Sequence, residues 1–266
     1  MKTRLFCLCL LCLFLLPARG AEYRTEKDIS YTAKTDAYSR ERLKLDIYRP
    51  EDARDLPVIV YFHGGGLTRG NKGIPAPLKE QNLVVVAVNY RFLPTVSIDD
   101  VIDDAAEAVD WVFRNIARYG GDPAKITVSG HSAGGYLSLM LALDKKRLAR
   151  YGADPDKVML YAPLSGQAIT HFNVRKEKGL SALQPTIDEY APLYWVRGDC
   201  PPMLLICGDR ELEIYGRYDE NQYLARMLKL NGNKQVWLYE IGGHGHSPMA
   251  KPAWHIVLKK IQELTK

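Results

Sequence analysis

The sequence predicts an α/β protein, a three-layer sandwich in which a mainly parallel β-sheet lies between two layers of helices. Short apolar segments rich in Val, Ile and Leu, typical of strands buried on both faces, alternate with segments of helical periodicity. The alternation runs along most of the chain without an internal repeat or a low-complexity tract. This pattern favours one layered domain with helices on both faces of the sheet.

The individual elements follow from the spacing of apolar residues. An antiparallel hairpin at 28–33 and 42–48 is expected to lead into the sheet. Helices with period-3.6 apolar stripes are predicted at 101–116, 133–143, 223–228 and 254–264. The core strands are predicted at 57–62, 83–89, 125–129, 157–161, 202–207 and 234–240.

Residues 165–196 interrupt this rhythm, because they combine mixed charge with little strand pattern. They lie between two predicted strands, so we expect a short insertion over the edge of the sheet, in the form of a small cap. A long surface loop without its own structure is the alternative.

Composition excludes several classes of protein. The chain has 266 residues, of which 47% are hydrophobic and 25% charged, so it can bury a large core and is not disordered. The net charge is +5, and three of the positive charges lie in the first 20 residues. Since no basic block remains beyond them, we expect no nucleic-acid binding. The sequence does not indicate an oligomeric state.

Residues 1–20 resemble a secretory signal peptide. Lys2 and Arg4 precede an uninterrupted apolar run of twelve residues, which is too short to span a bilayer. Ala18 and Gly20 place small residues where a signal peptidase cuts. We expect cleavage after Gly20, a secreted or periplasmic domain at 21–266, and no stable membrane span. An uncleaved anchor is the alternative.

Two cysteines remain beyond the apolar run, Cys200 and Cys207. The residues between them are predicted to be extended, which would separate their Cα atoms by roughly 23 Å. A disulfide needs Cα atoms within about 7 Å, so we expect two free, buried thiols.

The strongest chemical motif is the pentapeptide Gly-His-Ser-Ala-Gly at 130–134. It directly follows a predicted strand and opens an apolar helix. A serine at such a tight turn is forced towards positive φ, and crowding there requires the small residues Gly130 and Gly134. The Ser132 hydroxyl would then project from the carboxyl edge of the sheet, as a nucleophile does. A glycine-rich turn with Ser132 as a helix N-cap is the alternative.

A second motif, His-Gly-Gly-Gly at 63–66, ends the predicted strand 57–62. Consecutive glycines let backbone N–H groups point into open space, where an acyl-transfer enzyme needs donors for a developing oxyanion. A phosphate cradle would need Gly-Lys-Ser or Gly-Lys-Thr before a helix, and the chain has neither. The coincidence of this motif with the serine turn is more specific than either motif alone.

Together the motifs resemble the α/β-hydrolase fold, and within it the esterases related to hormone-sensitive lipase and to bifunctional feruloyl/acetyl-xylan esterases. The resemblance runs from about residue 42 to the C-terminus and is carried by segments 63–66, 89–91, 120–123, 130–135, 208–211 and 243–246. It implies that the N–H groups of Gly65, Gly66 and Ala133 form the oxyanion hole. It also implies a chain order of serine, acid and then histidine.

The catalytic base and acid are expected on the loops after the last two strands. Family spacing selects His246 over His244 as the base. The same spacing selects Glu211 as the acid, with Asp209 as the alternative, and Glu213 is interpreted as solvated surface. No third ligand cluster accompanies the two histidines, so a metal site is not expected. Nothing in the sequence indicates a cofactor.

The predicted function is a serine carboxylesterase that forms an acyl-enzyme on Ser132. The resemblance and the export signal suggest small acyl or feruloyl esters, on a small molecule or a polysaccharide. An aryl formamidase or a peptidase of the same fold is the alternative within the enzymes. A catalytically silent binding protein is the alternative of another class, disfavoured because such proteins usually lose one of these residues.

Overall fold

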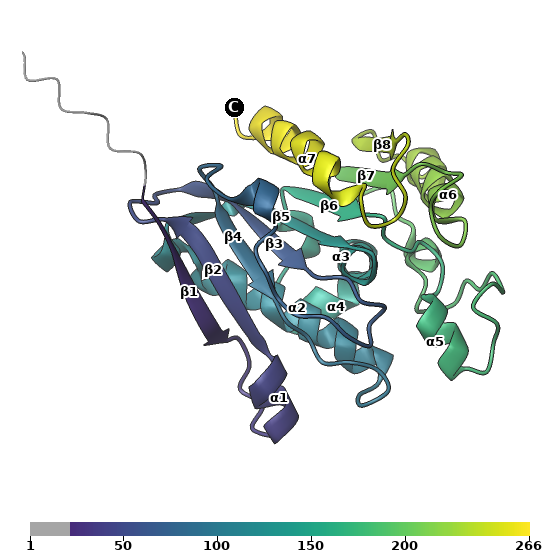
Figure 1. Ribbon diagram of the computed structural model, residues 1–266, viewed down its shortest axis with the longest axis horizontal. Helices are drawn as coiled ribbons and strands as arrows, with labels where there is room; N and C mark the ends of the chain where they lie inside the picture. Colours follow the sequence, from purple (N-terminus) through teal and green to yellow (C-terminus); the bar gives the residue numbers. More distant parts are fainter. Residues whose placement is uncertain (1–21) are drawn as a thin grey trace, which may run out of the picture.

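The computed structural model describes residues 22–266 (Figure 1). The expected signal peptide at residues 1–20 lies outside the described residues, so its cleavage stays a prediction. Across residues 22–266, no helix combines the length and the apolar character that a membrane crossing requires.

The sheet of the described chain has eight strands in the order β1-β2-β4-β3-β5-β6-β7-β8. The pairs from β4 to β8 are parallel, whereas β1–β2 and β2–β4 are antiparallel. The mainly parallel sheet with an antiparallel lead-in is therefore confirmed. The strands are β1 (Tyr23–Ser30), β2 (Lys44–Pro50), β3 (Leu56–Phe62), β4 (Val84–Val88), β5 (Gly121–His131), β6 (Leu160–Leu164), β7 (Met203–Gly208) and β8 (Val236–Ile241).

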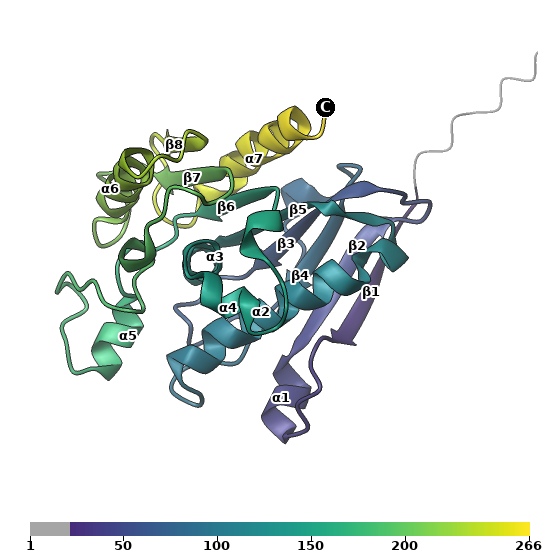
Figure 2. The same ribbon diagram turned by 180° about the vertical axis from the view of Figure 1, so that it is seen from behind.

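Helices cover both faces of this sheet. The helix α7 lies on the face that is in front in Figure 1, and α2 and α3 lie on the other face, which Figure 2 shows from behind. This three-layer arrangement is the one that the sequence predicts. The helices are α1 (Ala37–Arg42), α2 (Ile98–Asn115), α3 (Ala133–Leu143), α4 (Lys145–Ala149), α5 (Phe172–Glu177), α6 (Arg217–Leu230) and α7 (Ala250–Leu264).

Strand alternation divides the interior into two cores. Val58, Val60 and Phe62 of β3 pack in the cluster that contains the buried stripes of α2, α3 and α6. Ile59, on the opposite side of the same strand, packs in the cluster that contains α7. Because successive side chains of a strand point to opposite faces, an uninterrupted apolar strand fills both cores at once.

Register brings the two glycine motifs together. Phe62, the last residue of β3, pairs with Gly130 near the end of β5. The chain segments that follow these residues, 63–66 and 130–134, therefore leave the same edge of the sheet side by side.

Some boundaries differ from the expected ones. The strand predicted at 157–161 is β6 (Leu160–Leu164), and a short 3₁₀ helix, Pro155–Lys157, precedes it. Pro155 at the first turn favours this helix, because its fixed φ suits it and its missing N–H would have had no partner there. Cys200 and Cys207 are free and buried, as expected.

The segment 165–196 contains α5 and the short 3₁₀ helix Pro192–Trp195, with no strand. Asn173 of α5 donates from Nδ2 to the Gly66 carbonyl oxygen over 2.6 Å, so this segment contacts the glycine motif after β3. That this segment acts as a small cap over the active-site edge stays a prediction.

Candidate active site

Ser132 lies in a strained turn between β5 and α3. Its φ of 57° and ψ of −113° are outside the regions that non-glycine residues favour. A Cβ on Gly134 would lie 2.0 Å from the Phe62 carbonyl oxygen, and one on Gly130 would lie 2.4 Å from the Gly134 backbone. The turn therefore needs glycine at both positions, which is the steric pattern expected from the sequence.

A continuous hydrogen-bond chain runs from Ser132 through His246 to Glu213. The Ser132 Oγ lies 2.8 Å from His246 Nε2, and His246 Nδ1 lies 2.5 Å from Glu213 Oε1. The carboxylate is an acceptor, so Nδ1 carries the imidazole proton and donates it to Glu213. Nε2 is then free to accept the proton of the Ser132 hydroxyl.

The carboxylate beside His246 is not one of the two expected from the sequence. Glu211 is exposed, and the Asp209 side chain accepts from the backbone N–H groups of Glu211 and Gly243. Asp209 therefore ties the loop after β7 to the loop after β8. The side chain interpreted as solvated surface, that of Glu213, is only 1% exposed.

A tight turn after β7 places Glu213, and not Glu211, beside His246. The N–H groups of Leu212 and Glu213 both donate to the Asp209 carbonyl oxygen, so the chain reverses after β7. This reversal brings Glu213 Oε2 to the Gly208 N–H at 3.0 Å. The sequence carries one weak signal for this position, because Glu213 stands between the apolar residues Leu212 and Ile214.

The Glu213 carboxylate is held in its ionised form. Burial by itself would raise its pKa, but hydrogen bonds from His246 and Ser165 outweigh burial and lower the pKa from 4.5 to about 2. An ionised carboxylate at this place holds the imidazole in one tautomer and stabilises the imidazolium ion.

Ser165, at the end of β6, is a further group at this carboxylate that sequence reasoning missed. Its Oγ donates to Glu213 Oε2 over 2.7 Å and lies 2.9 Å from His246 Nδ1. Its φ is 49°, and its carbonyl oxygen accepts a hydrogen bond from the buried Arg217 guanidinium. This backbone strain, held by a buried partner, is consistent with a positioning role for Ser165.

We expect Ser165→Ala to lower kcat about tenfold with little change in KM, because a hydrogen bond to the charged Glu213 is lost away from the substrate pocket. Steady-state kinetics on an ester substrate measures both constants. Ser138→Ala is the matched control, because Ser138 is equally buried but donates to the Val128 carbonyl oxygen in the core. Equal kcat values for wild type and Ser165→Ala would contradict this role.

The three backbone donors implied by the resemblance lie around Ser132. Within residues 22–266, the N–H groups of Gly65, Gly66 and Ala133 are without a hydrogen-bond acceptor. Gly65 and Gly66 have φ values of 115° and 67°, which a residue with a side chain rarely adopts. Ala133 begins α3, where the helix dipole adds positive potential. Free donors in this position suit a developing oxyanion.

A pocket of about 710 Å³ opens in front of Ser132. It is lined by the loops that follow β3, β5, β7 and β8, and by α5 in the segment 165–196. Residues that line it include Gly65, Gly66, Arg69, Phe172, Lys176 and Ile214.

The remaining histidines near the site have structural contacts. His131 Nε2 donates to the His246 carbonyl oxygen over 2.8 Å, and burial together with the nearby His246 lowers its pKa to about 4. His131 is therefore neutral and anchors the loop that carries His246. His244 lies on that loop too, but its Nδ1 donates to the Gly242 carbonyl oxygen instead of reaching Ser132. In the described part of the chain, His, Cys, Asp and Glu residues form no group of three suited to a metal ion.

A family model described as BD-FAE matches residues 45–220, well over half of the chain. The chain belongs to the BD-FAE family. The resemblance stated from the motifs is thereby confirmed, and the match includes β2 to β7, the serine turn and Glu213.

Curated relatives of this BD-FAE member are esterases. The carboxylesterase NlhH of Mycobacterium tuberculosis is 39% identical over 134 residues, which cover 48% of this chain and 39% of NlhH. A probable isoprenylcysteine alpha-carbonyl methylesterase of Oryza sativa subsp. japonica, ICMEL1, is 38% identical over 109 residues, 39% of this chain and 26% of that protein. The chain thus matches well under half the length of these relatives.

Solved structures show the same fold. A truncated carbohydrate esterase from gut microbiota superposes with a TM-score of 0.74 at 19% identity, covering 94% of this chain and 99% of that one. The thermophilic carboxylesterase EstE1, cloned from a metagenomic library, has a TM-score of 0.67 at 20% identity, covering 93% and 90%. At these identities the likeness establishes the fold of this BD-FAE member, which is the α/β-hydrolase fold expected.

Proposed function

We propose that this BD-FAE member is a serine carboxylesterase, with Ser132 as nucleophile, His246 as general base and Glu213 as the acid that orients it. The observation that carries the proposal is the unbroken hydrogen-bond chain Ser132–His246–Glu213 beside free backbone donors. No other described group lies where it could replace Glu213 on His246 Nδ1, except the neutral hydroxyl of Ser165.

In the first half-reaction, Ser132 Oγ attacks the ester carbonyl carbon while His246 Nε2 takes the hydroxyl proton. The negative charge on the carbonyl oxygen is stabilised by the N–H groups of Gly65, Gly66 and Ala133. The C–O bond to the alcohol breaks, His246 returns the proton to the departing alkoxide, and an acyl group remains on Ser132.

In the second half-reaction, water attacks the acyl carbon and gives a proton to His246. The bond between Ser132 Oγ and the acyl carbon breaks, and His246 returns the proton to Oγ. Throughout both halves the ionised Glu213 stabilises the imidazolium that forms twice in each cycle.

We further propose that the substrates are small acyl or feruloyl esters on carbohydrates. Membership of the BD-FAE family supports this, as does the fold shared with a carbohydrate esterase. The Phe172 side chain in the pocket lining adds apolar surface beside which a sugar ring or an aromatic acyl group can lie. The features of residues 1–20 support a secreted or periplasmic site of action.

Covalent labelling tests this proposal. A fluorophosphonate should add to one residue of the 21–266 chain, and peptide mass spectrometry should locate the adduct on Ser132. The same preparation should release 4-nitrophenol from 4-nitrophenyl acetate. A folded protein without an adduct would instead be a silent binding protein. An adduct without ester turnover would point to a formamidase or a peptidase.

A further inference from the structure

The charged side chains that line the pocket in front of Ser132 are positive. Arg69, after the glycine motif, and Lys176, on α5, are exposed and line it. Among the described residues that line this pocket there is no Asp or Glu. The Glu213 carboxylate lies behind His246 with its side chain 1% exposed, so it is screened from the pocket.

Neither cation has an ion-pair partner within residues 22–266. No carboxylate lies within 4.0 Å of the Arg69 guanidinium or the Lys176 ammonium. Cations nearby are paired: Lys178, two residues from Lys176, contacts Asp188 at 2.7 Å, and Lys72 contacts Asp46 at 2.6 Å. The two pocket cations therefore keep their capacity to bind an anion.

One of the two cations, Lys176, lies over an aromatic ring. The Lys176 Nζ lies 5.5 Å from the centroid of the Phe172 ring, four residues earlier on α5. The hydrogen bond from Asn173 to the Gly66 carbonyl holds α5 against the loop that continues into Arg69. The pocket thus combines an aromatic side chain with two positively charged side chains.

We propose that Arg69 and Lys176 form a subsite for a carboxylate on the substrate, so that the preferred ester lies on an acidic carbohydrate such as an acetylated uronic-acid polysaccharide. The proposal rests on the esterase function above. A uronic acid fits this lining, because its carboxylate can pair with the guanidinium and the ammonium while its ring occupies the pocket in front of Ser132.

Two acetyl esters with matched leaving groups isolate the charge. 4-Acetoxybenzoate carries a carboxylate, and 4-acetoxybenzamide is its neutral counterpart. We expect kcat/KM to be about fivefold higher for the benzoate at low salt, since an exposed ion pair contributes a small factor. In 0.5 M NaCl this ratio should fall towards one, because salt screens exposed charges. Acetate release from acetylated galacturonan should likewise exceed release from neutral acetylated glucomannan.

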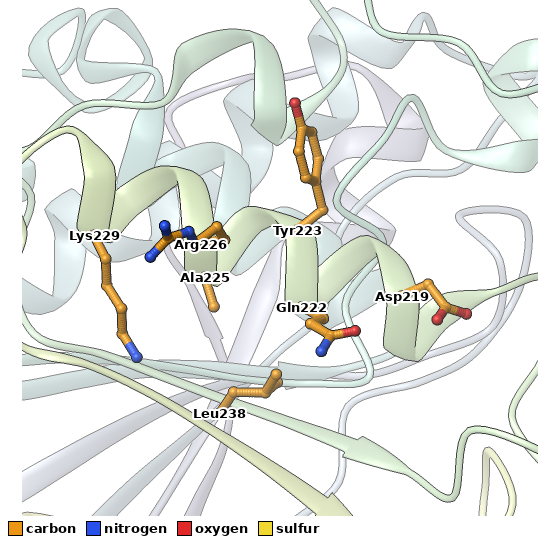
Figure 3. Close-up of a pocket in the computed structure, with 7 residues that line it drawn as sticks. All are labelled: Asp219, Gln222, Tyr223, Ala225, Arg226, Lys229 and Leu238. Carbon is orange, nitrogen blue, oxygen red and sulfur yellow. The ribbon is translucent and has the colours of Figure 1, made fainter.

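Substitutions at Arg69 and Lys176 test whether these two residues cause the preference for the benzoate ester. Arg69→Gln and Lys176→Gln should each lower the benzoate-to-benzamide ratio about twofold, and the double variant should abolish the preference. Arg69→Lys and Lys176→Arg should retain it. Lys229→Gln is the matched control, because Lys229 is an exposed lysine on α6 that lines a different pocket together with Asp219 and Arg226 (Figure 3).

The outcomes separate this inference from the proposed function. Equal kcat/KM for the two esters at low salt, with turnover of both, would overturn the carboxylate subsite and leave the esterase standing. A preference that survives in the double variant would also overturn it. A folded protein that hydrolyses neither ester, and takes no fluorophosphonate, would overturn both proposals.

Discussion

Replacing Ser132 with alanine is expected to lower kcat on 4-nitrophenyl acetate roughly 10⁶-fold, to the background of the free backbone donors. The loss is large because Ser132 Oγ forms the covalent bond, and no other hydroxyl takes its place at His246 Nε2. Steady-state release of 4-nitrophenol measures it. The fold should persist, since the Ser132 side chain makes no cap hydrogen bond to α3.

Ser129→Ala is a suitable control for the Ser132 variant. Ser129 lies three residues earlier on β5 and donates to the Ala162 carbonyl oxygen in the sheet. It should lose some stability while kcat stays near the wild-type value. Wild-type turnover by the Ser132 variant would mean that another residue is the nucleophile.

Replacing Glu213 with glutamine is expected to lower kcat on the order of 10⁴-fold, whereas Glu211→Gln should leave kcat unchanged. An amide at position 213 removes the charge that stabilises the imidazolium, and it can hold the wrong tautomer of His246. Glu211 is exposed and lies outside the hydrogen-bond chain. The reverse result would restore the assignment favoured by family spacing.

Wild type and Glu213→Gln should also differ in how their unfolding free energy depends on pH. The pKa of Glu213 is about 2 in the folded state and 4.5 without its partners. Because the folded pKa is the lower one, the ionised carboxylate stabilises the fold above about pH 4.5, and this contribution is lost as the pH falls towards 2. The advantage of wild type over Glu213→Gln in unfolding free energy should therefore be smaller at pH 3 than at pH 6. Urea unfolding at both pH values measures it, and a constant difference would contradict the shift.

Much of the sheet was predictable because its signals are local. The strand β3 has Val-Ile-Val at its centre and β4 is Val-Val-Val-Ala-Val, and such apolar runs are stable only where both faces are covered. The start of β6 was less predictable. The strand was expected from Lys157, but Lys157 belongs to the preceding 3₁₀ helix and β6 begins at Leu160.

The serine turn was also predictable, for a steric reason. Strand, turn and helix meet within five residues, so the backbone of residues 130–134 approaches that of Phe62 too closely for any Cβ at Gly134. This steric requirement involves residues that are close along the chain, so the short sequence motif is enough to predict it. Both histidines lie on the loop that directly follows the last strand, and family spacing selected His246, the one that contacts Ser132.

The carboxylate that contacts His246 could not be predicted in this way. Asp209, Glu211 and Glu213 all follow β7 within six residues, and each could reach a histidine on a loop of suitable shape. The turn that hydrogen-bonds Leu212 and Glu213 to Asp209 selects among them, and it uses Asp209 to hold the next loop. Ser165 follows β6, and Arg217, which contacts it, begins α6. Both are far from His246 along the chain, so no motif spacing could have predicted that they lie near it.

The layered fold and the steric pattern of the serine turn could be predicted from the sequence alone, because apolar periodicity and backbone crowding act between residues that are close along the chain. Only the folded chain shows which carboxylate contacts His246, that Ser165 lies beside this carboxylate, and that Arg69 and Lys176 line one pocket and form no ion pair within residues 22–266. These depend on loops from different strands meeting at one edge of the sheet, where small differences in loop path move a side chain from solvent into the site.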